Sequence, residues 1–77
     1  MKRKADGSRG VVVEVATPNA KVAWEIIFKL GYKYMSLYSG LLTTRMQIPV
    51  AKGYEEEVAE GIKETLKDEG IQCEVIY

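Results

Sequence analysis

Apolar and polar positions along the chain predict six elements in the order strand, helix, strand, strand, helix, strand. Residues 11–15 are β-branched and apolar almost throughout, as expected of a strand that is covered on at least one face. The period changes at Thr17, which can cap a helix, and at Pro18, which is favoured in the first helical turn, although Asn19 is a competing cap. We therefore expect a helix from this point to about Leu30, followed by a glycine that ends it.

Two further strands follow, joined by a hairpin. Residues 34–39 alternate between polar and apolar side chains, and Gly40 permits a tight turn. Every second residue after the turn shares one face of the next strand, and this face consists of Leu42, Thr44, Met46, Ile48 and Val50. We expect the two strands to be antiparallel neighbours.

A second helix is predicted from Tyr54 to about Glu69, where Gly70 terminates it. Glutamates fill its first turn and lysines lie toward its end, which complements the helix dipole. Residues 71–77 alternate again and predict the last strand. Its buried side is expected to hold Ile71, Cys73 and Val75.

Two strand-helix-strand halves joined by a hairpin predict an α+β fold. With right-handed crossovers it is a ferredoxin-like βαββαβ plait, a four-stranded antiparallel sheet of order 4-1-3-2 with two helices on one face. Residues 11–77 would form this single domain. Residues 1–10 contain four basic residues and one acidic residue, a net +3, without apolar periodicity, so we expect a flexible basic tail.

The composition of the chain limits the classes of function that it can have. A chain of 77 residues with zero net charge is one small domain without the uniform positive charge of many nucleic-acid binders. With one cysteine and no histidine, we expect no internal disulfide, no metal site and no cofactor, and we expect Cys73 to be a buried structural thiol. No apolar stretch suits a membrane span or signal peptide, so a cytoplasmic location is expected.

The first helix has more apolar surface than one sheet can cover. A polar stripe at a spacing of four residues begins at Lys21, and the rest of the helix is apolar over roughly two thirds of its circumference. Trp24 and Phe28 lie one turn apart on a border of this arc, and Val22 adds to it. These three residues are our candidate interface with a second subunit or another protein. The alternative is that the rings fold back onto the domain's own core.

The open face of the sheet is a second candidate surface. Arg45 with Glu14 is most simply a cross-strand ion pair on a solvated face. The alternative is a single-stranded nucleic-acid platform in which bases stack on Tyr34 or Tyr38 beside Arg45. RNA-recognition motifs, however, place their stacking aromatics on the two central strands, where this chain has residues such as Val12.

Catalysis is not expected. Acylphosphatases share the predicted strand order, but they need an arginine in the loop after the first strand, and residues 16–19 read Ala-Thr-Pro-Asn. Cys73 has no histidine to activate it as a nucleophile. The acidic residues of the second helix have the spacing of a solvated face, although their charge could engage a basic partner.

Residues 66–76, with the sequence Leu-Lys-Asp-Glu-Gly-Ile-Gln-Cys-Glu-Val-Ile, and residues 13–20, with Val-Glu-Val-Ala-Thr-Pro-Asn-Ala, give the chain a resemblance to ACT domains over residues 11–77. Thr17 stands where that family has an acidic residue, and Asn19 stands where it has a glycine. The resemblance implies a regulatory module that pairs with a second copy. It also implies an amino-acid site at the subunit seam, with Thr17, Pro18 and Asn19 as the ligand-binding residues.

These observations favour a small non-enzymatic binding or regulatory module that self-associates as a homodimer and has a small molecule as a further candidate partner. One alternative is a stand-alone adaptor or inhibitor of the viral or mobile-element type, which would act through Trp24 and Phe28 or through the acidic second helix. The other alternative is the single-stranded nucleic-acid binder.

Overall fold

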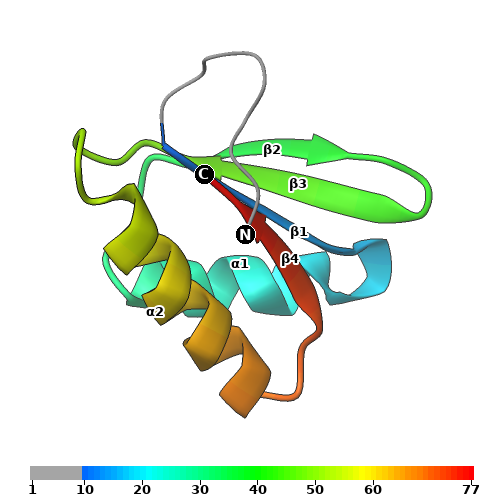
Figure 1. Cartoon of the computed structure of the whole chain (residues 1–77). Helices are drawn as coiled ribbons and strands as arrows, with labels where there is room; N and C mark the ends of the chain where they lie inside the picture. The colour runs from blue at the N-terminus through cyan, green and yellow to red at the C-terminus, as the bar shows by residue number, and fades with distance from the viewer. Residues whose placement is uncertain (1–9) are drawn as a thin grey trace.

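The computed structural model of the chain describes residues 10–77, so nearly all of the predicted basic tail, residues 1–10, lies outside the described residues. Its elements follow the expected order, with one short 3-10 helix added (Figure 1). They are β1 (Val11–Ala16), the 3-10 helix η1 (Thr17–Asn19), α1 (Ala20–Lys29), β2 (Ser36–Ser39), β3 (Thr43–Ile48), α2 (Glu55–Asp68) and β4 (Cys73–Ile76).

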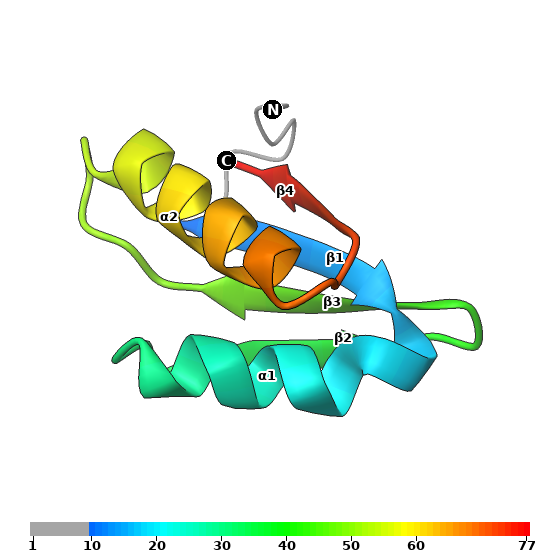
Figure 2. The ribbon, with the colours of Figure 1, turned by 90° about the horizontal axis from the view of Figure 1, so that it is seen from below.

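The four strands form one open antiparallel sheet in the order β2-β3-β1-β4, which reads β4-β1-β3-β2 from the other edge. Both helices lie on one face of this sheet (Figure 1). Seen from the helix side, α1 runs along β2 and β3, whereas α2 runs along β1 and β4 (Figure 2). The predicted α+β class, the four-stranded antiparallel sheet and the two helices are thereby confirmed.

The core lies between the sheet and the helices, and strand alternation explains its composition. On β1, Val11, Val13 and Val15 are buried, while Val12 and Glu14 on the other face are partly exposed. The other buried apolar side chains are Ala23, Ile27, Met46, Ile48, Ala59, Ile62, Leu66, Ile71 and Val75. Cys73, expected on the buried side of the last strand, is only partly buried.

The chain after β1 differs from the sequence prediction. Thr17 does not cap α1, because the turn over Thr17–Asn19 is a 3-10 helix and α1 begins only at Ala20. The Thr17 hydroxyl instead donates to the carbonyl oxygen of Gly40 at 2.8 Å. Asn19 occupies the N-cap position of α1 and makes no side-chain capping bond. The helix α1 therefore begins two residues after Pro18, with the competing cap Asn19 at its N-cap position, because a contact distant in sequence engages the threonine.

The ends of both helices agree with the sequence. Gly31 and Gly70 have positive φ angles, which glycine adopts without steric cost. After α2, the amide of Ile71 donates to the carbonyl of Leu66 and the amide of Gly70 to that of Lys67, both at 2.9 Å. This pair of bonds is a Schellman motif. Within residues 10–77, neither helix has the length and apolar character needed to cross a bilayer.

Candidate functional site

Trp24 and Phe28 form one stacked pair on α1, with ring centroids 4.9 Å apart and an interplanar angle of 22°. The fully buried residues of this helix, Ala23 and Ile27, face the sheet. Trp24 and Phe28 each follow a buried residue by one position and are therefore rotated by about 100° around a right-handed helix. This rotation places both rings on one flank of the helix. We call this pair the outer flank of α1.

The two rings differ in how far they are buried. Trp24 is partly buried and packs against the core, whereas Phe28 is 37% exposed. Val22, the third candidate interface residue, is 52% exposed. It precedes Trp24 by two positions, about 200° around the helix, so the structure does not bring Val22 onto the outer flank.

The β2 edge, Ser36–Ser39, lies beside α1 (Figure 2) and has no strand on its other side in the described part of the chain. All four of its residues are exposed, and none is charged or proline. Leu37 stands opposite the buried Met46, so it points to the helix side of the sheet, where it is 46% exposed. An exposed apolar side chain and an unpaired strand edge therefore lie beside the helix that carries the two rings.

On the open face of the sheet, Tyr38, Arg45, Glu14 and Glu74 stand opposite one another in a row across all four strands. The predicted cross-strand pair is confirmed, because Arg45 Nε donates to Glu14 Oε2 at 2.7 Å. Tyr34 precedes β2 and lies outside this row. The nucleic-acid platform of Tyr34, Tyr38 and Arg45 stays a prediction, and its arginine is already engaged by a carboxylate.

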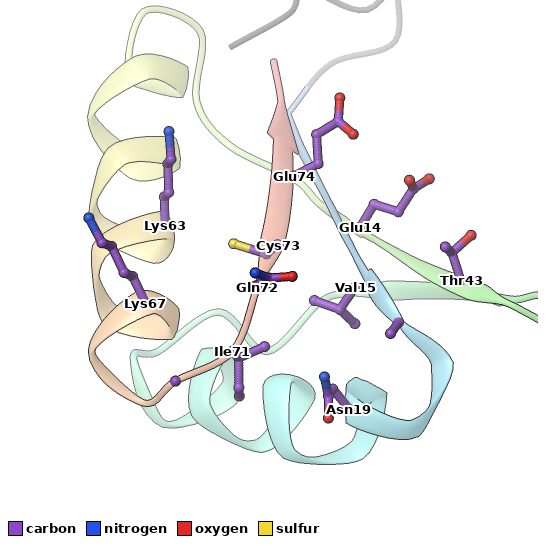
Figure 3. Close-up of a pocket in the computed structure, with 12 residues that line it drawn as sticks. Glu14, Val15, Asn19, Thr43, Lys63, Lys67, Ile71, Gln72, Cys73 and Glu74 are labelled. Carbon is purple, nitrogen blue, oxygen red and sulfur yellow. The ribbon is translucent and has the colours of Figure 1, made fainter.

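An open cavity of about 820 Å³ lies on the opposite side of the molecule from the β2 edge, between the end of β1, β4 and the second half of α2 (Figure 3). Lys63 and Lys67 border it from α2, and Glu14 and Glu74 border it from the strands. The remaining lining residues are Val15, Ala16, Asn19, Thr43, Gly70, Ile71, Gln72 and Cys73. The cavity therefore presents both positive and negative charges, an arrangement that sequence reasoning missed.

Cys73 lines this cavity, with its sulfur directed toward the side of α2 (Figure 3). Burial raises the pKa of the Cys73 thiol, and the Lys63 ammonium offsets part of that rise. The thiol therefore holds its proton at neutral pH, which does not favour a nucleophile.

The segment expected to bind an amino acid divides in the structure. Asn19 borders the cavity and Pro18 is exposed, whereas the Thr17 hydroxyl is bonded to the β2–β3 hairpin. Only one of the three predicted ligand-binding residues therefore reaches the cavity. The amino-acid site stays a prediction.

The β2–β3 hairpin connection was not recognised as a site from the sequence. Leu42, expected on the inward face of the strand, instead lies in the connection and is 80% exposed, and its neighbour Leu41 is 96% exposed. A glycine followed by two leucines at a predicted turn was the available signal.

Among residues 10–77, no three histidine, cysteine, aspartate or glutamate side chains gather where they could hold a metal ion. Comparison with known proteins finds no matching family model, no matching curated protein and no matching solved structure.

Proposed function

We propose that this protein is a small, non-enzymatic, cytoplasmic binding module of the ferredoxin-like type that self-associates as a homodimer through the outer flank of α1 and the β2 edge. The observation behind this proposal is that exposed apolar side chains lie next to an unprotected strand edge. We further propose that the dimer is regulatory and acts on a separate protein, as the ACT resemblance implies.

The two sheet edges differ in a way that favours β2 as the interface. Edge strands with charged residues or proline resist pairing with other chains, whereas uncharged edges pair readily. The β2 edge reads Ser-Leu-Tyr-Ser, and the opposite edge, β4, contains Glu74. Association through β2 would give its exposed backbone amide and carbonyl groups hydrogen-bond partners without burying a charge.

A twofold axis beside β2 satisfies both features at once. Two antiparallel β2 strands would join the sheets of two copies into one sheet of eight strands, four from each copy. Leu37 points to the helix side, so Leu37 and Phe28 of each copy would meet beneath the joined strands. Burial of these side chains would contribute the hydrophobic part of the association free energy, and the hydrogen bonds between the paired strands would fix the relative orientation of the two copies.

The decisive experiment is the solution mass by light scattering across a hundredfold concentration range. We expect the wild-type chain, 8.6 kDa, to have twice this mass. Phe28→Ser combined with Leu37→Ser should give a folded monomer, because both side chains are more than one third exposed and contribute little to the core.

Val22→Ser is the matched control, since it removes a comparably exposed apolar side chain from the other flank of α1 and should leave the dimer intact. A wild-type monomer at every concentration would refute the proposal. So would a double variant whose dimer is as stable as that of Val22→Ser.

A further inference from the structure

We propose that the outer edge of β4 is a docking site for an extended acidic segment of another protein, which joins the sheet as a fifth strand. β4 lies at one end of the sheet, and within residues 10–77 no strand lies on its outer side. An edge strand directs alternate amide and carbonyl groups outward, where an added strand can bond to them. This inference is independent of self-association, because the proposed dimer uses β2, the other edge of the sheet.

Two lysines of α2 border the cavity beside this edge. Lys63 and Lys67 are about one helical turn apart, are exposed and line the same cavity (Figure 3). Each has a glutamate three positions earlier, a usual partner on a helix, yet neither lysine forms an ion pair with a described residue. Like charges at this spacing repel one another, so a carboxylate placed beside them is attracted to both.

The other side of the cavity carries charges of the opposite sign. Glu14 and Glu74 stand opposite one another on β1 and β4 and belong to the open face of the sheet. Arg45, which pairs with Glu14, does not line the cavity. In Figure 3 the two glutamates lie to one side of β4 and the two lysines to the other. The outer edge of β4 therefore runs between a basic helix side and an acidic open side.

An extended peptide is the class of ligand that fits this division of charge. Successive side chains of a strand point to opposite faces, so an added strand can place acidic residues on the helix side and neutral or basic residues on the open side. Main-chain hydrogen bonds then contribute affinity and the alternate side chains contribute specificity. A nucleic-acid strand carries phosphates along its whole length and would bring negative charge to the glutamates as well.

Neither edge strand of a second copy has the required pattern. On the helix side, β2 presents Leu37 and Ser39, and β4 presents Cys73 and Val75, none of which is acidic. Antiparallel pairing of two β4 strands would also place both Glu74 side chains on the same open face, where they repel one another. The occupant is therefore a segment of a different protein with acidic residues at every second position.

The test measures the binding of two fluorescently labelled eight-residue peptides by anisotropy. In the first peptide four threonines alternate with four glutamates, and in the second the four glutamates are consecutive between pairs of threonines. The two have the same composition and charge, but only the first places all its glutamates on one face of a strand. We expect the alternating peptide to bind about fivefold more tightly or better, and its affinity to fall with added salt.

Lys63→Gln combined with Lys67→Gln should weaken binding of the alternating peptide about fivefold, because it removes two exposed charge contacts. Lys21→Gln combined with Lys29→Gln is the matched control, since it removes two exposed lysines from α1 that do not line the cavity. N-methylation of the central amides of the alternating peptide should abolish its binding, because it removes donors of the strand hydrogen bonds while keeping every charge.

Cys73 reports where the peptide binds, because its sulfur lies in the cavity. The saturating alternating peptide should slow alkylation of this thiol by iodoacetamide. The inference is overturned if the alternating peptide does not bind at millimolar concentration, if the two peptides bind equally, or if the alkylation rate stays unchanged. Phe28→Ser combined with Leu37→Ser should bind the peptide as the wild type does, so failure of the dimer proposal and failure of this inference are seen separately.

Discussion

Two glycines illustrate how one residue type has opposite roles in this chain. Gly10 has a φ of +98°, and a Cβ atom there would collide with the backbone carbonyl of Ile48. Gly61 lies inside α2 with ordinary helical geometry, and a Cβ atom there would meet nothing within 4 Å. The first glycine is required by the backbone, whereas the second only costs helix stability.

We therefore predict that Gly10→Ala lowers the free energy of unfolding by about 1–3 kcal/mol, because the left-handed backbone and the collision must both be relieved. Gly61→Ala should raise it by about 0.5–1 kcal/mol, since alanine is the better helix former and restricts the unfolded chain. Urea denaturation monitored by circular dichroism measures both. Equal shifts of the two midpoints would mean that the backbone at Gly10 is not constrained as described.

The Cys73 thiol leads to a prediction about how the stability of the fold depends on pH. Burial raises its pKa above the ordinary value of 9.0, so the folded chain holds the proton more tightly than the unfolded chain does. The resulting stabilisation is fully present below pH 9 and is lost as the pH rises through the pKa of the folded state.

Alkylation by iodoacetamide across this range should show a midpoint above pH 9.0 in the folded protein and a lower midpoint in denaturant. Lys63→Gln should move the folded midpoint higher still, because the Lys63 ammonium favours the thiolate. A folded midpoint below that of the denatured chain would show an activated cysteine and would reopen the question of catalysis.

At the scale of elements, hydrophobic period together with the glycine and proline positions located every strand and both α-helices of residues 10–77, because a helix repeats every 3.6 residues and a strand every 2. The errors occur where contacts between residues distant in the sequence determine the local structure. Thr17 resembles a helix cap locally, yet its hydroxyl bonds to Gly40, 23 positions away. Leu42 continues the strand alternation but falls in a three-residue connection, residues 40–42, so its side chain is exposed.

The candidate sites were less predictable than the elements. The apolar excess of α1 was visible from sequence, but the difference between its two flanks depends on where α2 and β2 lie. The cavity is formed by α2 and β4, which are consecutive in the chain, together with the end of β1, which is distant from them in sequence. The Arg45–Glu14 pair was the exception, because strand register alone brings the two residues together. Since the arginine side chain is 62% exposed, we expect the pair to contribute only about 0.2–1 kcal/mol.

At the scale of the whole molecule, pairing along β2 would leave the β2–β3 connection outside the interface. Antiparallel pairing of two β2 strands directs the hairpins of the two copies in opposite directions.

Self-association also predicts how stability depends on concentration. A chain of 77 residues has a small core, so dimerisation should contribute a large share of its stability. Each tenfold increase in protein concentration stabilises a folded dimer by about 0.7 kcal/mol per chain, which corresponds to about 3–5 °C in Tm for a domain of this size. Calorimetry across two decades of concentration measures this slope. The wild type and Val22→Ser should share it, whereas Phe28→Ser with Leu37→Ser should show none. If the Tm of the wild type does not change with protein concentration, the stability of the fold comes from the single chain alone. Phe28 and Leu37 would then not contact a second copy, and the dimer proposal would be contradicted.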